Sequence, residues 1–394
     1  MVYEICDKTK CTGCGLCGAV CSKNAISFQL DELGFRYPVI DAEKCVDCHL
    51  CIKKCPSANP VTFYERNDCY LAWSKDDITH FNSSSGGICY EFGKKVIEQG
   101  GVVAGCVWDK DFNAVFKLID NIEELQRTVG SKYVQSYISN EVFEQIKESS
   151  KERTVLFVGL PCQAAAMSRI GGGKFLIIGD LLCHGGCSPK CLKSHIGTIQ
   201  EKKGIKKVTD IRFRGGEQNC KFTLWNGNEL VYKDSMFLDT YFYTFMKHSL
   251  LNEACYHCQY AQSNRVSDVT IADFWGIDEN FLKEKKVLNG HNLVLVHTDK
   301  GNDLLNAISD RIELYERPYQ EAVAGNDTLK APTRKPTGRE EDIIRIKKYG
   351  FEKAVRKDKG YQHYQKIKRQ NKLHDYARKA IPNLLIDLIK SIKR

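Results

Sequence analysis

Short apolar runs alternate with amphipathic segments between about residue 61 and residue 330 of the chain. Runs of three or four β-branched or apolar residues bounded by glycine predict buried strands, and apolar positions three and four residues apart predict helices with one polar face. The expected strands contain residues 102–104, 114–116, 155–158 and 175–178, and the expected helices span residues 121–128, 140–150, 189–203 and 236–251. This alternation predicts an α/β domain with some mixed α+β character.

The two ends of the chain differ from this middle part. The first sixty residues are dense in cysteine, and the last sixty are rich in Lys, Arg, Glu and Tyr. We therefore expect three units, at residues 1–60, 61–334 and 335–394, with the last a basic and mostly helical tail.

An amphipathic helix is expected at the end of the tail. From Pro382 onward, apolar residues recur at helical spacing beside Lys and Arg. Packing onto the protein body or a second subunit is the more common use of such a helix, and peripheral contact with an anionic membrane surface is the alternative. The apolar positions are Leu384, Leu385, Leu388, Ile389 and Ile392.

Positive charge is concentrated in this tail. The 394 residues carry a formal net charge of +9, and residues 335–394 contain 18 Lys and Arg against 7 Asp and Glu. The tail alone therefore carries +11, and residues 1–334 carry −2. A nearly neutral body gives no support to nucleic-acid binding, and we expect no nucleic-acid partner.

The chain contains 19 cysteines, far more than ordinary usage. Disulfides outside the reducing cytosol and thiolate-bound metals inside it are the two explanations for such a number. The N-terminus lacks the apolar core of a signal peptide, no apolar run is long enough to span a bilayer, and an odd number suits disulfides poorly. We expect a cytoplasmic protein whose cysteines bind metal.

Two cysteine motifs with identical spacing, CxxCxxCxxxC, dominate the N-terminal unit. This spacing is typical of bacterial-type ferredoxins, in which the fourth cysteine of each motif binds the cluster of the other motif. A zinc site would use two CxxC pairs and leave the fourth cysteines unexplained. We predict one 4Fe-4S cluster on Cys11, Cys14, Cys17 and Cys55, and another on Cys45, Cys48, Cys51 and Cys21.

A further set of cysteines lies in the large unit. Cys162 and Cys183 each follow a predicted strand, and the C-terminal ends of strands gather at one edge of an open α/β sheet, where ligands bind. Together with the pair Cys255 and Cys258 they provide four thiols. Spacing alone leaves a third metal site and ordinary buried cysteines equally open. The cysteines that compete for the same role are Cys187, Cys191 and Cys220.

Two small loops are candidates for contact with phosphate. Residues 83–87 precede a helix that begins near Ile88, and residues 130–133 join a turn to the charge of Lys132. Hydroxyl and backbone N–H groups at a helix N-terminus bind anions, although such loops also cap helices or form surface turns without any ligand. Neither loop fits the Walker or Rossmann fingerprint, so spacing alone does not indicate nucleotide binding.

Six segments in order resemble the family of the coenzyme F420 hydrogenase/dehydrogenase beta subunit. They are SSGG (84–87), GSKY (130–133), GLPCQ (159–163), CHG (183–185), CxxC (255–258) and NRVSDVTIADFWG (264–276). The resemblance covers residues 1–276, is expected to reach residue 330, and includes a ferredoxin module found in many members. It implies a flavin-binding large domain that holds FAD, and a third 4Fe-4S cluster on Cys162, Cys183, Cys255 and Cys258.

The resemblance also implies which side chains lie near the flavin, with Lys132 as a phosphate partner. For proton delivery we nominate His184 and Asp273, because an imidazole titrates near neutrality and burial can raise the pKa of a carboxyl group. A core histidine and a helix-capping aspartate are equally consistent with these two residues. The expected flavin-binding residues are Ser84, Ser85, Gly86, Gly87, Gly130, Ser131, Lys132, Tyr133, Arg265 and Trp275.

The implied activity is that of an iron-sulfur flavoprotein oxidoreductase. Clusters pass single electrons, whereas a flavin handles one electron or two. The expected route joins the ferredoxin clusters, the third cluster, FAD and a two-electron carrier or substrate, either an F420-like deazaflavin or a reducible biosynthetic intermediate. The alternative is a non-catalytic electron-transfer subunit that docks on a partner enzyme. The expected partners are a ferredoxin or another redox protein, and a small-molecule hydride carrier.

Overall fold

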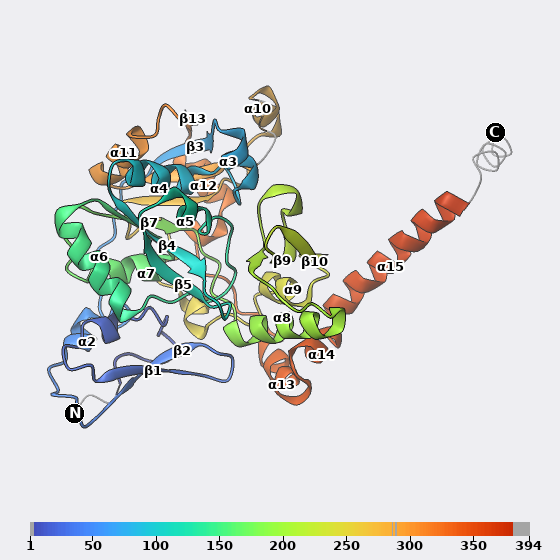
Figure 1. Ribbon diagram of the computed structural model, residues 1–394, viewed down its shortest axis with the longest axis horizontal. Helices are drawn as coiled ribbons and strands as arrows, with labels where there is room; N and C mark the ends of the chain where they lie inside the picture. Colours follow the sequence, from blue (N-terminus) through green and yellow to red (C-terminus); the bar gives the residue numbers. More distant parts are fainter. Residues whose placement is uncertain (1–3, 286, 288–289, 381–394) are drawn as a thin grey trace.

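The computed structural model describes residues 4–285, 287 and 290–380 (Figure 1). The chain forms a small N-terminal unit, a large mixed sheet covered by helices, and a second, three-stranded sheet beside which the C-terminal helices lie. None of the described helices is both long enough and apolar enough to cross a membrane.

The N-terminal unit consists of two short helices and one strand pair. Each cysteine motif contributes a helix, α1 (Leu16–Ala19) or α2 (Leu50–Lys54), and the antiparallel pair β1 (Ile26–Leu30) and β2 (Arg36–Ile40) separates them. Helix α1 packs against α6 (Asn140–Glu152) of the large unit. The first motif is therefore the one next to the body of the protein.

Eight strands form the large sheet, in the order β13-β3-β12-β11-β7-β6-β4-β5. The four strands from β11 to β4 run parallel, and the outer pairs are antiparallel. The strands predicted around residues 102, 114, 155 and 175 are confirmed as β4 to β7. The bounds are β3 (Asp68–Ser74), β4 (Val102–Trp108), β5 (Ala114–Ile119), β6 (Val155–Gly159), β7 (Leu176–Leu181), β11 (Val269–Asp273), β12 (Asn292–Val296) and β13 (Ile312–Glu316).

Helices cover both faces of this sheet because its central strands are apolar on both sides. Leu156 packs toward α4 on one face, and its neighbour Phe157 packs toward α6 and α7 on the other. The helices predicted at 121–128 and 140–150, and the helix start near Ile88, are confirmed. The bounds are α3 (Asp77–Asn82), α4 (Ile88–Glu98), α5 (Ile122–Gln126), α7 (Pro161–Met167), α10 (Glu279–Glu284), α11 (Asp299–Asn306) and α12 (Tyr319–Gly325).

The second sheet was not predicted from the sequence. It is antiparallel, in the order β10-β9-β8, and packs with two helices around an aromatic core that includes Phe213, Phe222 and Tyr241. Its helices confirm the predicted segments 189–203 and 236–251, although the second is shorter. The bounds are α8 (Pro189–Lys203), β8 (Asp210–Arg212), β9 (Lys221–Asn226), β10 (Glu229–Ser235) and α9 (Thr240–Met246).

The described part of the expected tail is helical. It contains α13 (Arg339–Tyr349), α14 (Phe351–Arg356) and α15 (Lys359–Ala380). Ile343 and Phe351 belong to the same core as the second sheet, so the first two helices are packed parts of the body. Helix α15 points away from the rest of the molecule (Figure 1). The amphipathic helix predicted from Pro382 lies outside the described residues.

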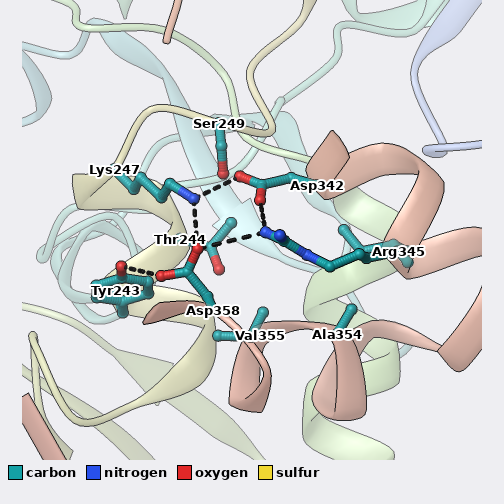
Figure 2. Close-up of a pocket in the computed structure, with 10 residues that line it drawn as sticks. Tyr243, Thr244, Lys247, Ser249, Asp342, Arg345, Ala354, Val355 and Asp358 are labelled. Atoms are coloured by element: carbon teal, nitrogen blue, oxygen red, sulfur yellow. Dashed lines mark hydrogen bonds and ion pairs between the residues drawn. The ribbon is translucent and has the colours of Figure 1, made fainter. Parts of the chain in front are cut away.

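A buried polar network joins α13 and α14 to α9 around a hollow of about 250 Å³ (Figure 2). The Lys247 ammonium lies 2.8 Å from a carboxylate oxygen of Asp342 and 2.8 Å from one of Asp358. Arg345 contacts the same two carboxylates, and the Tyr243 hydroxyl donates to Asp358 at 2.6 Å. These charges are paired with one another, so the hollow is a structural joint, in which the Nε of Arg345 has no hydrogen-bond partner among the described residues.

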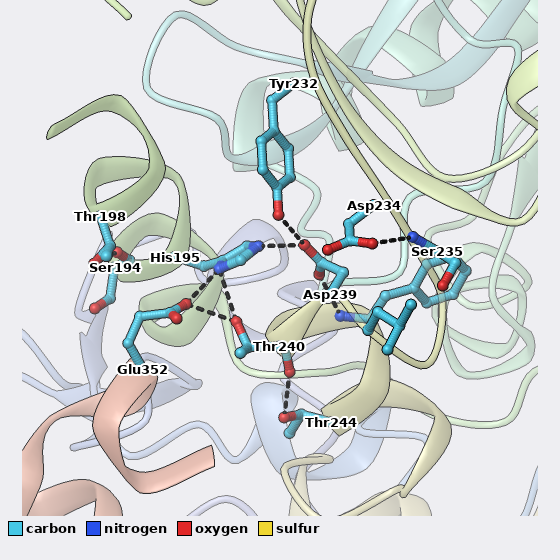
Figure 3. A network of polar contacts seen from close by, with 12 residues as sticks. Ser194, His195, Thr198, Tyr232, Asp234, Ser235, Asp239, Thr240, Thr244 and Glu352 are labelled. Carbon is cyan, nitrogen blue, oxygen red and sulfur yellow. Dashed lines mark hydrogen bonds and ion pairs between the residues drawn. The ribbon is translucent and has the colours of Figure 1, made fainter. Parts of the chain in front are cut away.

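A second network centres on His195 of α8 (Figure 3). Its Nε2 lies 2.7 Å from a carboxylate oxygen of Asp239, and its Nδ1 lies 2.5 Å from one of Glu352. Burial alone would lower the pKa of His195, but the charge and hydrogen bond of Asp239 and those of Glu352 raise it to about 9. The imidazole is therefore charged at neutral pH and links α8 to both α9 and α14.

Candidate functional site

Four cysteines drawn from both ferredoxin motifs line one hollow of about 410 Å³. Cys21 belongs to the first motif, and it lies with thiols of the second. This crossing between motifs is what ferredoxin spacing predicts for a cluster of four irons. Cys48 is exposed to solvent. We name these residues the outer set: Cys21, Cys45, Cys48 and Cys51.

The remaining ferredoxin cysteines lie deeper. Cys55 of the second motif lies within electrostatic reach of Cys11 of the first. Interaction with the Cys6 thiol lowers the pKa of Cys11 and lowers the pKa of Cys55 to about 6. Burial raises the pKa of Cys14 to about 12, with smaller effects from the charges of Cys11 and Cys55. We name these residues the inner set: Cys11, Cys14, Cys17 and Cys55.

A third group of thiols meets at the C-terminal edge of the parallel strands. Cys162 begins α7 directly after β6, and Cys183 follows the adjacent parallel strand β7. Burial raises the pKa of Cys162 and of Cys183, and the charge of Cys258 raises both further. The pKa of the Cys255 thiol is raised in the same way, by burial and then by Cys183. We name these residues the central set: Cys162, Cys183, Cys255 and Cys258.

The competing cysteines lie elsewhere. Cys187 and Cys191 are buried in the aromatic core, where Cys187 contacts Tyr241. Cys220 lies in the loop before β9.

The inner and central sets are neighbours. The charge of Cys14 contributes to the raised pKa of Cys162, which places these two thiols within electrostatic reach of each other. Tyr260 is 2 % exposed. Burial raises the pKa of its hydroxyl, and the charges of Cys162 and Cys14 raise it further. Beside it, the Gln259 amide donates a 2.8 Å hydrogen bond to the carbonyl of Pro56, the residue that follows the last ferredoxin cysteine. The sheet domain therefore holds the N-terminal unit directly at the central set.

The thiols of the outer set line a hollow. Across the described ranges 4–285, 287 and 290–380, no three His, Cys, Asp or Glu side chains meet closely enough to hold a single metal ion. Four irons keep their ligand sulfurs farther apart than one ion does, so grouped but separated thiols suit cubanes. The outer set with its hollow gives the clearest fit.

The two predicted loops are brought together beside the central set. The hydroxyl of Ser131 donates to that of Ser84 at 3.1 Å. Arg214, which follows β8 of the second sheet, joins them: its guanidinium lies 3.0 Å from Asp273 and 3.3 Å from the Tyr133 hydroxyl, and it donates to the Ser84 carbonyl at 2.5 Å. Burial opposes the charged form of Arg214, but Tyr133 and Asp273 raise its pKa well above its usual value.

Cys89, at the start of α4, lies near the second loop. Desolvation raises the pKa of its thiol to about 11. The ammonium of Lys132 is close to Cys89 and Cys106, and burial lowers its pKa. It donates to the carbonyl of Thr128 at 3.3 Å, so in this structure it caps the end of α5.

Other predicted flavin residues have clear local roles. A side chain on Gly86 would place its Cβ 2.5 Å from the carbonyl of Ala72, so only glycine lets this loop pack on β3. Gly87 precedes α4 with φ 86°, and the Ser85 hydroxyl donates to the His291 carbonyl at 2.7 Å. Gly130 likewise has a positive φ, of 87°.

The candidate catalytic residues lie within electrostatic reach of each other. Burial lowers the pKa of His184, while the charges of Asp327 and Asp273 oppose this effect. The His184 ring stacks on His248 at 5.9 Å, and burial lowers the pKa of His248 to about 4. His184 is therefore an uncharged imidazole at neutral pH, adjacent to Cys183 of the central set. Trp275 is 59 % exposed.

Arg265, a predicted flavin residue, is buried next to the central set. It is 2 % exposed, pairs with Asp180 at 2.7 Å and donates to the carbonyl of Tyr260 at 2.8 Å and to Thr270. Its charge also lowers the pKa of Cys183 and Cys258, although burial raises both. The guanidinium therefore braces the central set, and the two loops are contacted by Arg214. The segment Arg214-Gly215-Gly216, an arginine before two glycines, was the only sequence signal for that residue.

Models of known protein families match three segments of the chain. The C-terminal model of the coenzyme F420 hydrogenase/dehydrogenase beta subunit matches residues 152–322, its N-terminal model matches residues 69–141, and a 4Fe-4S dicluster domain matches residues 10–59. The chain belongs to the family of the coenzyme F420 hydrogenase/dehydrogenase beta subunit. The 4Fe-4S character of the N-terminal unit is confirmed.

Relatives in this family have names linked to F420. The chain is 25 % identical over 323 residues to coenzyme F420-dependent sulfite reductase of Methanocaldococcus jannaschii, and the match covers 77 % of this chain and 47 % of that protein. It therefore spans about half the length of that relative. It is 22 % identical over 336 residues to one of the subunits of the F420H2 dehydrogenase of Methanosarcina mazei, covering 80 % of this chain and 87 % of the relative.

A solved structure has also been aligned with this chain. A chain from the F420-reducing [NiFe] hydrogenase complex of Methanosarcina barkeri aligns with 75 % of this chain and 96 % of its own length, at 16 % identity and a TM-score of 0.44.

Proposed function

We propose that the chain is an iron-sulfur flavoprotein oxidoreductase that moves electrons between ferredoxin-type 4Fe-4S clusters and FAD, and from there to or from a two-electron carrier. The observation that carries this proposal is the serial arrangement of the three cysteine sets. The outer set reaches the surface at Cys48, the inner set lies against the sheet domain, and Cys14 is close to Cys162 of the central set. One-electron carriers in a row provide a path into the protein.

The two loops joined by Arg214 form the proposed flavin site. Ser84 and Ser131 supply hydroxyls, Lys132 a positive charge, and Arg214 fixes both loops to Asp273. Bound FAD would supply the conversion between two-electron and one-electron chemistry. Arg265 is not included because its donors are occupied at the central set.

His184 and Asp273 keep their proposed role in proton delivery. An uncharged imidazole beside Cys183 can accept a proton, and Asp273 pairs with Arg214 at 3.0 Å.

The proposed two-electron partner is an F420-like deazaflavin, because both named relatives have F420 in their names. A reducible biosynthetic intermediate is the alternative substrate. A redox protein, such as a ferredoxin, is the proposed one-electron partner at the outer set.

The rival proposal is a non-catalytic electron-transfer subunit. Such a subunit would carry the same clusters and would turn over only with its partner enzyme. The second relative is named as one subunit of a dehydrogenase, which favours this alternative.

Two measurements on anaerobically purified full-length protein test the proposal. Iron, sulfide and flavin quantitation is expected to give about twelve irons and one FAD per chain, as three cubanes require. The protein alone should then oxidise reduced F420 with a viologen dye as acceptor. About eight irons would remove the central cluster, and dye reduction that needs an added partner would establish the rival function.

A further inference from the structure

The guanidinium of Arg36, the first residue of β2, lies against two aromatic rings. Its central carbon is 3.9 Å from the centre of the Phe28 ring and 4.8 Å from the centre of the Tyr137 ring. Phe28 belongs to the N-terminal unit and Tyr137 to the large unit, so the cation lies at the boundary between them. Stacking on aromatic rings leaves the N–H groups at the edge of the guanidinium in need of acceptors.

One of these donors has no acceptor. The Nη1 atom of Arg36 is buried and has no hydrogen-bond partner among the described residues. The hydroxyl of Thr12, within the first cysteine motif, is also buried without such a partner. Unsatisfied buried donors are costly, above all on a charged group, so each of them marks a place where a further acceptor is expected.

Arg36 and its stacking partner Phe28 both pack against the loop of the first motif. A Cβ on Gly13 would lie 2.8 Å from the carbonyl oxygen of Arg36, and a Cβ on Gly18 would lie 2.9 Å from the ring of Phe28. Phe28 also packs against the apolar cluster that contains Cys17. The first motif therefore surrounds its cysteines with a stacked arginine that has a donor to spare.

Charge leads to the same placement. Burial lowers the pKa of Arg36, whereas the charges of Tyr137, Cys17 and Cys14 raise it. An arginine keeps its proton in proteins, so the guanidinium is a permanent cation. Arg36 therefore places a fixed positive charge beside the thiols of the inner set.

We propose that Arg36 sets the reduction potential of the cluster bound by the inner set, through its buried charge and a hydrogen bond from Nη1 to a cluster sulfur. Net charge, hydrogen bonds to sulfur and solvent exposure determine the potential of such a cluster. A buried cation favours the more negative, reduced state because little water screens it, and it therefore raises the potential. The inference rests on the proposed function only in that the inner set binds a 4Fe-4S cluster.

The first test is an EPR-monitored redox titration of the anaerobically purified full-length protein and three variants. Arg36→Gln is expected to lower the potential of one cluster, with about a tenfold fall in its ratio of reduced to oxidised form at fixed potential, which is about 59 mV for a one-electron couple. Arg36→Lys keeps the charge and should change this ratio less than about threefold. Lys10→Gln is the matched control: Lys10 precedes Cys11 but is exposed, so its removal should move no potential.

A second measurement does not require an Arg36 variant to fold. The parent protein is prepared with arginine whose guanidinium nitrogens carry an isotopic label, reduced, and studied by pulsed EPR. A coupling between labelled nitrogen and the spin of one cluster is expected, because a hydrogen bond to sulfur carries spin density to its donor. The same coupling should persist in Arg169→Lys, since the Arg169 guanidinium donates instead to a backbone carbonyl, that of Cys55, at 3.2 Å.

The outcomes separate this inference from the proposed function. Parental potentials in Arg36→Gln at parental iron content, or an equal shift in Lys10→Gln, would overturn the inference and leave the proposed function standing. If Arg36→Gln loses the inner cluster, the labelled protein decides: coupling that persists in Arg169→Lys supports the inference, and coupling that is absent from the parent or lost in Arg169→Lys overturns it. A parent protein without ferredoxin clusters would instead defeat the proposed function.

Discussion

Single residues decide how the two predicted flavin loops are held together. Arg214 is the side chain that connects the Ser84 loop, the Tyr133 loop and Asp273, and it does so through charged hydrogen bonds in a half-buried place. A guanidinium can hold a carboxylate and a carbonyl at once because its donors form a rigid planar fork, whereas an ammonium is a single point.

Replacing Arg214 by lysine is therefore expected to weaken flavin binding. Losing one charged hydrogen bond of this kind corresponds to an increase in Kd of about tenfold. The measurement is fluorescence titration of the deflavinated variant with FAD. Arg212→Lys is the matched control: its side chain is 51 % exposed and pairs with Asp210 at the surface, so its substitution should leave the affinity unchanged. Equal affinity in Arg214→Lys and parent would place the flavin elsewhere.

At the level of secondary-structure elements, the second sheet and the C-terminal helices are joined by buried charge. His195 links α8, α9 and α14, and Lys247 links the end of α9 to α13 and to Asp358, which lies between α14 and α15. Such pairs are expensive to break because removal of one partner leaves an uncompensated buried charge. The joint fixes the sheet that carries Arg214 next to the large sheet that carries Asp273.

The stability provided by His195 should depend on pH. Its pKa is raised from 6.5 in the unfolded chain to about 9 in the fold, so its contribution is complete below pH 6.5 and disappears as the pH rises through 9. The full effect is about 3 kcal/mol, set by the size of the shift.

The measurement is the apparent Tm of the parent and of His195→Gln between pH 6 and pH 10, at one scan rate. At low pH the parent should have a higher apparent Tm than His195→Gln. This difference in Tm should become smaller as the pH rises toward 10. His363→Gln, at an exposed position on α15, is the control and should follow the parent. A difference that stays constant with pH would mean that the buried imidazole is uncharged.

In the molecule as a whole, the proposed electron route depends on the order in which the cysteine sets are arranged. The N-terminal unit contacts the sheet domain through its inner set, and the Gln259–Pro56 hydrogen bond and Tyr260 fix that contact. The outer set is left at the surface with Cys48 exposed. In the proposed route, electrons therefore pass through the central set on their way between the ferredoxin clusters and the flavin.

Removing one thiol of the central set should slow electron transfer between the proposed flavin and the ferredoxin clusters while both remain bound. Cys162→Ser is expected to reduce the iron content from about twelve to about eight per chain, with both ferredoxin clusters retained. Reduced F420 should still bleach the flavin in stopped-flow measurements, while cluster reduction becomes much slower than in the parent. Cys220→Ser controls for thiol loss. Rapid cluster reduction in Cys162→Ser would show that electrons bypass this set.

Several features could be predicted from sequence because they depend on neighbours along the chain. The spacing of Cys11 to Cys21 and of Cys45 to Cys55 specified a dicluster ferredoxin, and short apolar runs located strands β4 to β7. The positions of Cys162 and Cys183 after parallel strands predicted that these thiols meet. Each of these inferences uses local periodicity or one topological rule, and none requires knowledge of a long-range contact.

Other features depend on residues far apart in the chain and became visible only in the folded protein. Arg214 reaches Ser84 across 130 positions. Arg265, expected at the flavin, is drawn to Asp180 because a buried guanidinium needs a carboxylate. Helices α13 and α14, expected in a separate tail, enter the aromatic core through Ile343 and Phe351. The amino-acid sequence thus determined which side chains are suited to redox chemistry. The tertiary structure determined which of them are neighbours and which partners they contact, because distance and burial are properties of the fold.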